Sequence, residues 1–371
     1  MKLRVDRQEF TEAIAWATRV AGSRAALPAL TGVLLEAGDG RLVCRATDLE
    51  VSAEISVSAT VDKPGRMLLA ARFLAQLVAR FPDAPVDLED DGDRVRITCG
   101  RAKFSVRRLQ AEDFPAMPPI ADDAARGTVK ADALARLVSQ VGRAAAVGDD
   151  ARAVLTGVNL EASDGRLVAA ATDTYRLAAR SLAFEDAIEG EAIVPVRALQ
   201  EVARAAGEVG GTVTVVLGGG QVSFLLGDRT LTSRLIEGPF PNYRSLLPDA
   251  SEVTVVVDRA ELTEALQRVA VVASAQTNTP VLLAFSTDGV DIQASNQEAG
   301  DASEQIAAAV EGGELEIAFN PAYLLSGLEA TGTEKVRFEL RDGLRAAVIR
   351  QHAEDGEVDD LTYLLMPMRV S

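Results

Sequence analysis

The chain has 371 residues, of which 48% are apolar and 4% aromatic, so its cores must be built from Ala, Val and Leu rather than from rings. Acidic residues outnumber basic ones by 55 to 38, and the net charge of −17 excludes a uniformly basic nucleic-acid-binding protein but allows a local basic surface. Two isolated cysteines, Cys44 and Cys99, support neither a disulfide framework nor a metal knuckle. Because no signal-peptide core and no apolar run of about 18 residues is present, we expect a soluble cytoplasmic protein in a reducing compartment.

The first 120 residues predict two rounds of one strand, one helix and three strands. Asp6 is a good N-cap, and Phe10, Ile14 and Ala17 follow it at helical spacing on one face. The turn at 63–65, Lys-Pro-Gly, separates the two rounds. The expected helices are 7–20 and 71–80, and the expected strands are 2–5, 30–36, 41–47, 51–59, 66–69, 86–89, 94–99 and 103–109.

The same order of elements continues after two linkers, at 118–127 and 238–249, which are rich in Pro and polar residues. Asp258 is a second N-cap, and the pair Asn320-Pro321 places Pro in its favoured first turn of a helix. The expected helices are 132–146, 196–206, 259–272 and one from 321, and the expected strands include 212–217, 222–226, 229–235, 253–257, 336–340, 345–350 and 362–365.

An internal repeat organises the chain. LTGVLLEAGDGRLVCRATD, from Leu30, returns as LTGVNLEASDGRLVAAATD from Leu155, 125 residues further on, and its Ser-Asp-Gly predicts a hairpin turn. A third copy, VLLAFSTDGVDIQASN, aligns Ser295 with Thr172 at a step of 123. We therefore expect three α+β domains at 1–120, 128–247 and 250–371, each with two helices packed on two small antiparallel sheets.

The residues offer little material for catalysis. His352 is the only histidine, in a polar stretch that predicts a solvated loop. The acidic stretches 89–93 and 354–357 lack the ligand spacing of a calcium loop and are typical of exposed turns. We expect no enzyme activity, no metal and no cofactor. The alternative is a metal-dependent enzyme on the duplicated scaffold, which would depend on the cluster at 90–93.

Basic residues concentrate on some of the helices. The stretches 71–80 and 130–147 each carry a charge of +2, and 195–206 carries +1, on a body of −17. Such helices could surround a polyanion and bind phosphates without reading sequence. Charge alone equally fits ordinary solvated helix faces.

Several motifs in one order are similar to those of the bacterial DNA sliding clamp, the β subunit or processivity factor of DNA polymerase III. These are the threefold repeat, the segment ATDTYRL from Ala171, the linker FPNYR from Phe240 and the terminal MPMR from Met366. The resemblance spans the whole chain. It implies the DNA-clamp fold, a head-to-tail homodimer that closes a six-domain ring, and sliding on duplex DNA without sequence specificity.

The resemblance also implies a hydrophobic pocket between the second and third domains. Short linear motifs of the DNA polymerase III catalytic subunit, the clamp loader, other polymerases and repair proteins would insert Leu and Phe there, against flexible Met side chains. The implied pocket residues are Leu155, Thr172, Tyr175, Arg176, Leu177, Pro241, Leu246, Asn320, Tyr323, Leu364, Met366, Pro367, Met368 and Arg369. Plain core packing is the competing interpretation for Leu155, Leu177 and Leu364.

Two further sets of residues follow from the resemblance. Positions that match DNA contacts are Arg24, Arg72, Arg152 and Arg197. The ring contact would use an edge strand of the first domain against the third domain of the partner chain. Its implied residues are Arg101, Lys103, Phe104, Val106, Val271, Val272, Glu298 and Glu304.

The chain departs from the family pattern at three places. Tyr175 stands where many relatives have His, and Ala153 and Val154 stand where some have tyrosines that touch DNA. The stretch 296–300 is less acidic than usual. A second hypothesis is therefore a clamp paralogue that serves a specialised repair polymerase or inhibitor resistance.

Overall fold

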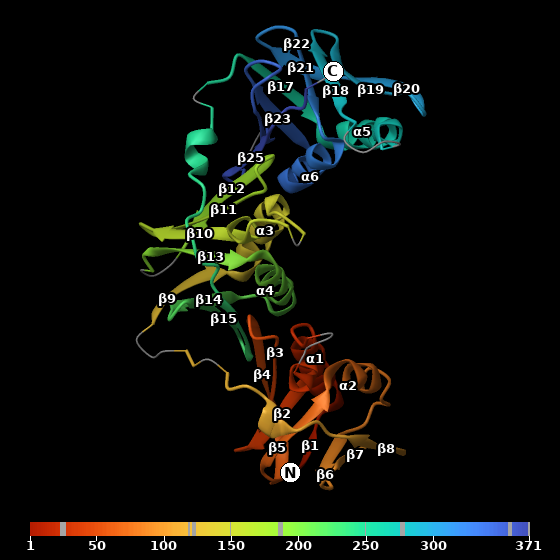
Figure 1. Ribbon diagram of the computed structural model, residues 1–371, viewed down its shortest axis with the longest axis vertical. Coiled ribbons are helices and arrows are strands. Elements are labelled where there is room, and N and C mark those ends of the chain that lie inside the picture. Colours follow the sequence, from red (N-terminus) through yellow and green to blue (C-terminus); the bar gives the residue numbers. More distant parts are fainter. Residues whose placement is uncertain are drawn as a thin grey trace. The chain divides into compact units, whose positions relative to one another are not determined.

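The computed structural model describes residues 1–22, 27–117, 119–120, 124–148, 150–184, 188–248, 250–274, 279–354 and 358–369. The chain forms two compact units (Figure 1). The first unit is mainly Met1–Asp132 with Arg204–Leu235, and the second is mainly Ala133–Glu185, Glu189–Ala203 and Ile236–Ser371. Each unit is described by itself below.

The first unit is built on one antiparallel sheet of 12 strands in the order β8-β7-β6-β1-β4-β16-β15-β14-β9, with β2, β3 and β5 branching from β4. Helices α1 (Arg7–Thr18) and α2 (Ala71–Val78) pack against each other and against it. The strands are β1 (Lys2–Val5), β2 (Gly32–Gly38), β3 (Arg41–Thr47), β4 (Val51–Lys63), β5 (Gly65–Ala70), β6 (Val86–Asp90), β7 (Arg94–Cys99), β8 (Ala102–Arg107), β9 (Ala125–Lys130), β14 (Thr212–Gly218), β15 (Gln221–Leu226) and β16 (Arg229–Arg234).

The second unit has a sheet of nine strands, β13-β10-β11-β12-β25-β24-β23-β17-β21, and a sheet of four, β20-β19-β18-β22. Its strands are β10 (Gly157–Ser163), β11 (Arg166–Thr172), β12 (Arg176–Ala183), β13 (Gly190–Pro195), β17 (Val253–Asp258), β18 (Val281–Ser286), β19 (Gly289–Asn296), β20 (Gly300–Ile306), β21 (Ala308–Glu311), β22 (Leu315–Phe319), β23 (Lys335–Leu340), β24 (Ala347–His352) and β25 (Leu361–Leu365). The remaining helices are α3 (Ala131–Val141), α4 (Val196–Val209), α5 (Arg259–Ala273) and α6 (Pro321–Thr331).

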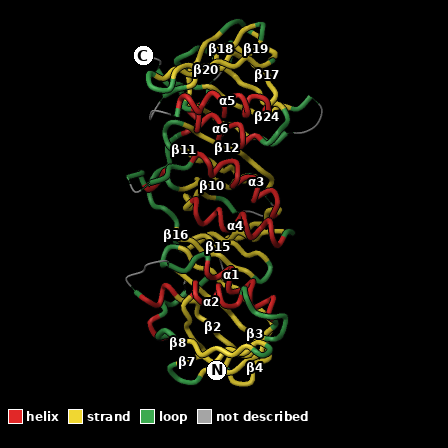
Figure 2. Tube along the Cα trace, turned by 90° about the vertical axis from the view of Figure 1, so that its right-hand side faces the viewer, coloured by secondary structure: helices red, strands yellow, loops and turns green. Residues whose placement is uncertain are grey.

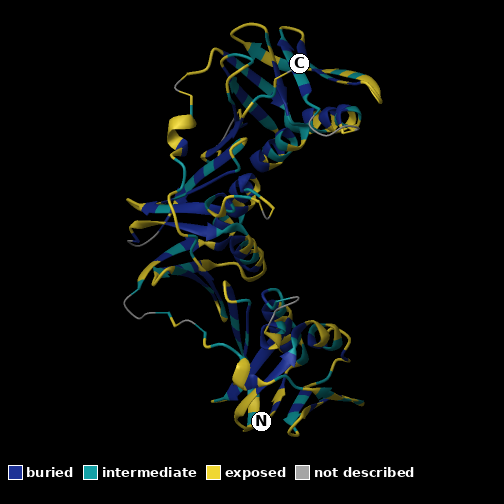
Figure 3. Cartoon of the chain, viewed as in Figure 1, coloured by how far each residue is buried: buried dark blue, intermediate teal, exposed yellow. Residues whose placement is uncertain are grey.

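Within each unit the helices gather on one side of the sheets (Figures 1 and 2). Burial is concentrated in the strands and on the helix faces turned toward them, while the outer helix faces are exposed (Figure 3). Alternating strand residues and one stripe of each helix therefore form the core, as their periodicity requires. Among the described residues, six α-helices and antiparallel sheets confirm the predicted α+β class.

The predicted helix starts are confirmed by their caps. The Asp6 carboxylate accepts from the N–H groups of Gln8 and Glu9 at 2.8 and 3.1 Å. Asp258 and Asn320 cap α5 and α6 in the same way. Helix ends were predicted less well, because α3 already ends at Val141 and passes into a 3₁₀ turn, whereas the predicted helix ran to 146.

The sheets continue from one sequence repeat into the next. Strand β4 pairs with β16 from Val51↔Ser233 to Ile55↔Arg229, and β12 pairs with β25 from Arg176↔Leu365 to Arg180↔Leu361. The small separate sheets that the sequence predicted are thus joined edge to edge. Strand pairing across more than 170 residues leaves no trace in local periodicity, which explains why the sequence did not predict it.

The polar neighbours of His352 predicted a solvated loop, and this prediction is wrong. His352 is the last residue of β24, half-buried, and pairs in register with Lys335. Both cysteines are free thiols, and burial raises the pKa of Cys44 and Cys99. None of the helices in the described ranges is both long and apolar enough to span a bilayer.

The only tryptophan lies where β4 meets β16. Trp16 is 2% exposed, and its Nε1–H donates to the Glu54 carbonyl at 3.1 Å. The guanidinium groups of Arg19 and Arg229 lie 6.0 and 5.6 Å from its ring and donate to opposite oxygens of Glu208, at 2.8 and 2.6 Å. One carboxylate thus holds two arginines against one indole.

Replacing Glu208 with Gln is expected to release both arginines and to lower the free energy of unfolding by about 1 kcal/mol, because the carboxylate is partly exposed and its ion pairs are screened. Burial alone would raise the pKa of Glu208, but hydrogen bonds from Arg19 and Arg229 outweigh it and keep the pKa below its ordinary value. The stabilisation of the folded protein by the Glu208 carboxylate is therefore fully present above about pH 4.3, the pKa of Glu in an unfolded chain. It is lost as the pH falls through the lowered pKa of the folded state.

Trp16 emission reports this release. An acid titration should change the emission of the unmodified protein before global unfolding, and Glu208→Gln should show the changed emission already at neutral pH. Identical emission in the two proteins across the titration would contradict the prediction.

Candidate functional site

The five-residue turn at 172–176, which joins β11 to β12, carries three of the residues predicted for the partner pocket. The Asp173 carboxylate accepts from the N–H groups of Tyr175 and Arg176, both at 3.0 Å, and the Thr172 hydroxyl donates to the Arg176 carbonyl at 2.7 Å. Thr174 has φ 78°, a strained conformation for a β-branched residue, which these bonds enforce. The turn leaves Tyr175 62% exposed.

The other repeats contain the same turn. In the first copy, Asp48 accepts from the N–H groups of Glu50 and Val51, and Leu49 has φ 81°. In the third copy, Asn296 takes the place of the aspartate and accepts from Glu298 and Ala299 at 2.9 and 3.0 Å. The repeat inferred from sequence is therefore a repeat of hydrogen bonding, and only the second copy presents an aromatic side chain at its tip.

Two tyrosines and an arginine form a stack beside this turn. The Tyr175 and Tyr323 rings are 6.3 Å apart and inclined by 27°, and the Arg176 guanidinium lies 4.5 Å from the centre of the Tyr323 ring. The Arg176 side chain is 12% exposed and bonds Asp173 at 2.9 Å. The Tyr363 hydroxyl donates to the Tyr323 carbonyl at 3.1 Å, and burial raises the pKa of that hydroxyl, which favours the neutral donor.

The floor beside the stack is apolar. Ala170, Leu177, Tyr243 and Leu364 form a buried cluster, against which Phe240, Leu247 and Ala346 pack. These side chains come from β11, β12, β25, the segment around the 3₁₀ turn η5 (Tyr243–Leu246) and, for Ala346, the residue just before β24. Leu177 and Leu364, at 1% and 2% exposure, are core residues in this structure, so any contact they make with a partner requires side-chain movement.

The C-terminal segment is tied down by its backbone. Beyond β25, the Met366 N–H donates to the Tyr175 carbonyl at 2.9 Å and the Met368 N–H to the Ala318 carbonyl at 2.8 Å. Met366 is 43% exposed, and Pro367 and Met368 are half-buried. Chain ends are usually mobile, so these bonds give the terminal methionines defined places, Met366 beside the turn of Tyr175 and Met368 beside β22.

The remaining predicted pocket residues have varied environments. Asn320 caps α6 by accepting from the N–H groups of Ala322 and Tyr323, and so orients Tyr323. Pro241 accepts from the Tyr243 N–H. Leu155 is buried in the 3₁₀ turn η4 (Ala153–Leu155), while Leu246 and Arg369 are exposed, and these three lie outside the contacts given above.

The predicted ring-contact residues lie on or just before β8 and β20, which are end strands of their sheets in the described part of the chain, and on helix α5. In β8, Phe104 and Val106 are half-buried and alternate with exposed Lys103, with Arg101 exposed just before the strand. Phe104 also stacks on Phe81 at 5.7 Å. Edge strands with free backbone groups and apolar side chains favour pairing with another chain.

On the second unit the predicted contact involves α5 and β20. Val271 is 69% exposed and Val272 half-buried, both on α5. Glu298 is exposed, but Glu304 already bonds Arg268 of α5 at 3.0 and 2.6 Å. That ion pair lowers the pKa of Glu304. A basic side chain of a partner would therefore have to compete with Arg268 for the Glu304 carboxylate.

The four arginines predicted to contact DNA are not all described. Arg24 lies outside the described residues. Arg72 is exposed on α2, Arg152 is exposed before η4, and Arg197 is exposed in the first turn of α4.

The chain is similar to known proteins over its whole length. Family models of the DNA polymerase III beta subunit match in sequence order: the N-terminal domain at residues 1–118, the central domain at 128–242 and the C-terminal domain at 244–369. The beta sliding clamp of Streptomyces coelicolor is 36% identical over 380 residues, covering 100% of both chains. The chain belongs to the bacterial sliding-clamp family.

Solved structures and a second curated relative agree with this assignment. The Pseudomonas aeruginosa clamp bound to griselimycin has a TM-score of 0.92 at 32% identity, and the Bacillus subtilis clamp has 0.93 at 27%, each with 100% coverage of both chains. A beta sliding clamp homolog of Streptomyces muensis is 32% identical over 378 residues, covering 100% of this chain and 99% of its own. The three-domain clamp fold expected from the resemblance is thus confirmed.

The candidate site also contains residues that the sequence did not single out as site residues. Asp173 holds the turn, Tyr243 fills the floor and Tyr363 anchors Tyr323. Asp173 could have been identified from the sequence, because its counterpart Asp48 stands in the first copy of the repeat. Tyr243 could also have been found, because it belongs to the linker motif FPNYR that carries the family resemblance. Tyr363 looked like any other strand residue.

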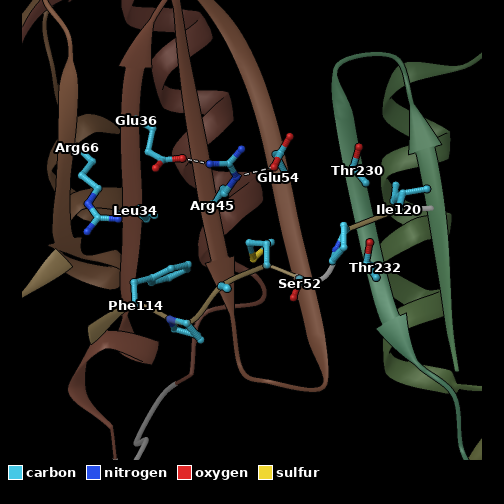
Figure 4. A pocket seen from close by; sticks show the side chains of 14 residues that line it. Leu34, Glu36, Arg45, Ser52, Glu54, Arg66, Phe114, Ile120, Thr230 and Thr232 are labelled. Carbon is cyan, nitrogen blue, oxygen red and sulfur yellow. Dashed lines mark hydrogen bonds and ion pairs between the residues drawn. The ribbon is translucent and has the colours of Figure 1, made fainter. Parts of the chain in front are cut away.

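The first unit has a groove at the corresponding place (Figure 4), of about 610 Å³. By the 125-residue offset, Arg45 and Ser52 replace Ala170 and Leu177 of the floor. Arg45 is bonded to both Glu36 and Glu54, so an apolar anchor would have to cover charged groups. Desolvating such pairs is costly, and this groove does not suit the Leu and Phe side chains that the family resemblance implies.

Three acids of the stretch 89–93, which contains the cluster of the alternative metal-site hypothesis, form ion pairs with arginines. Arg96 bonds Glu89 at 2.8 Å and Asp91 at 2.9 Å, and Arg108 bonds Asp90 at 3.1 Å. Within the described ranges, no group of three or more His, Cys, Asp or Glu side chains could hold a metal ion. Most of the second acidic stretch, at 355–357, lies outside the described residues.

Proposed function

We propose that two copies of this chain form a head-to-tail ring that encircles duplex DNA, slides without sequence specificity and tethers the replicative polymerase, without catalysing a reaction or carrying a cofactor. The proposal includes the division into domains 1–120, 128–247 and 250–371 and a cytoplasmic location. The observation that carries it is a pair of free sheet edges, β8 and β20, in a chain that belongs to the sliding clamps over its full length.

The two edges make a closed dimer possible. Strand β8 lies at one edge of the 12-stranded sheet, and β20 lies at one edge of the four-stranded sheet. If β8 of one chain meets β20 and α5 of its partner, Phe104 and Val106 face Val271 and Val272. A head-to-tail contact that closes after two copies uses both edges and leaves neither exposed.

DNA would be held loosely. Arg72, Arg152 and Arg197 are exposed and lie on or beside helices, where they can reach phosphates from the helix-lined side of the ring. A few such contacts on a body of net charge −17 give weak, salt-dependent attraction that favours sliding over fixed binding. We include Arg24 in this set on the family resemblance alone.

Partners would dock beside the tyrosine stack. Tyr175, Leu246 and Met366 are large apolar side chains at 62%, 53% and 43% exposure, close in sequence to the buried floor of Leu177, Tyr243 and Leu364. An anchor of Leu or Phe that reaches this floor gains apolar burial, while the adaptable methionines accommodate different motifs. The proposed partners are the DNA polymerase III catalytic subunit, the clamp loader, other polymerases and repair proteins.

Loading on nicked circular DNA followed by linearisation tests the ring. A protein held by topology stays on the closed circle through a salt wash and leaves within minutes once the DNA has ends. Blocking both ends with a bulky protein should restore retention. Retention on linear DNA with free ends would contradict encirclement.

A specialised paralogue is the second candidate. The family resemblance implies His at position 175 in many members, whereas Tyr175 of this chain stacks on Tyr323, and this difference favours the second candidate. Growth after depletion of the protein separates the two roles. Arrest of DNA replication is expected for a housekeeping clamp, and unimpaired growth would support the specialised role.

A further inference from the structure

The basic residues of α3 and the 3₁₀ turn that follows it are paired with acids of the C-terminal domain. Arg143 donates its Nη1–H to Glu329 of α6 at 2.5 Å and its Nε–H to the Ser139 carbonyl at 2.8 Å. Arg136 lies 3.8 Å from Asp359 in the segment before β25. The charge of +2 that the sequence predicted for 130–147 is therefore largely compensated within the chain.

The Arg143–Glu329 pair is easily exchanged. The two side chains are 38% and 50% exposed, so water screens their attraction. Glu329 stands in the last turn of α6, where the helix dipole disfavours a carboxylate, so it does not stabilise its own helix. Asp359 is different, because it also bonds the nearly buried Arg180 at 2.5 Å and so belongs to the core. Glu329 is the acid that can let its arginine go.

A DNA phosphate and Glu329 offer Arg143 the same kind of bond. Helices α3 and α6 lie on the same side of the second unit's sheets (Figures 1 and 2), the side that the proposed function turns toward DNA. An arginine with an acid already in place gains less from a phosphate than an unpaired one, because each phosphate contact first breaks an ion pair.

We propose that Glu329 is an internal counter-anion, which competes with DNA phosphates for Arg143 and so keeps the protein mobile on DNA. This inference rests on the proposed function. Arg143 becomes a DNA-contacting residue whose hold on each phosphate is short, because the carboxylate recaptures it as the duplex moves. The acid thereby lowers friction without removing the positive charge that keeps DNA near.

Glu329→Gln tests the proposal, with Glu314→Gln as a matched control. Glu314 is an exposed residue in the turn before β22, so its replacement changes the net charge equally without releasing Arg143. Diffusion on stretched duplex DNA and retention on nicked circles should be measured across a salt series. Glu329→Gln is expected to slow diffusion by about twofold to fivefold at low salt. The dependence of log affinity on log salt should steepen by about 0.9.

The outcomes separate the levels of the argument. A double variant with Arg143→Gln should behave like Arg143→Gln alone, because the acid acts only through that arginine. Equal diffusion for Glu329→Gln, Glu314→Gln and the unmodified protein would overturn the inference while leaving the ring intact. Loss of the unmodified protein from closed circles would overturn the proposed function and the inference together. Melting curves confirm that each variant is folded.

Discussion

A variant that ends at Leu365 is expected to lose binding of partner peptides, weakened by roughly thirtyfold or more, while it still forms the dimer. The deletion removes Met366 to Ser371, of which the described part carries the exposed Met366 and the half-buried Met368. It also removes the bonds from Met366 to the Tyr175 carbonyl and from Met368 to the Ala318 carbonyl. The apolar Met366 side chain is then absent beside the tyrosine stack, and a peptide anchor buries less apolar surface.

Fluorescence polarisation with a labelled peptide containing Leu and Phe measures the loss, and sedimentation measures the dimer. Met366→Ala with Met368→Ala keeps the backbone ties and should give an intermediate loss. If the truncated protein became monomeric, the tail would be a structural part of the ring rather than a docking element.

The sequence predicted local structure well where one residue decides it. Asp6, Asp258 and Asn320 are caps in the structure because a short acceptor before an apolar stripe satisfies the first N–H groups of a helix. The repeated Thr-Asp at 47 and 172 likewise specifies a turn, because the Thr hydroxyl donates to a carbonyl only four residues further along the chain in both copies. Such features need no knowledge of distant partners.

Burial and pairing in the site depend on distant residues, and the sequence could not give them. Leu177 and Tyr175 are two positions apart, yet one is 1% exposed and the other 62%, because Leu177 packs in the cluster with Tyr243 and Leu364 whereas Tyr175 stands at the tip of the turn. The charge of α3 was countable, but its compensation by Glu329, 186 residues away from Arg143, was not. The sequence did not predict β13, because its apolar run is short and its strand conformation depends on pairing with β10.

Replacing Val271 with Asp is expected to dissociate the dimer, with dimer affinity weakened by about a hundredfold or more. Val271 is 69% exposed on α5, so a carboxylate there is hydrated in the single chain and should not disturb folding. In the proposed contact it would lie beside Phe104 and Val106 of the partner's edge strand. A buried carboxylate without a partner costs several kcal/mol, which exceeds what one apolar contact contributes.

Val147→Asp is the matched control, because Val147 is 86% exposed and lies outside the proposed ring contact. Sedimentation equilibrium across a dilution series should show monomers for Val271→Asp and dimers for Val147→Asp, with closely similar melting temperatures. Val271 is a cleaner target than Phe104, since Phe104 stacks on Phe81 within its own chain and its loss would mix folding with assembly. The Val271 variant should also lose topological retention on nicked circles and keep peptide binding, because the proposed docking residues lie on β11, β12, η5, α6, β25 and the tail, and none of them lies on α5. A Val271→Asp protein that remained a dimer would show that β8 and α5 do not form the ring contact.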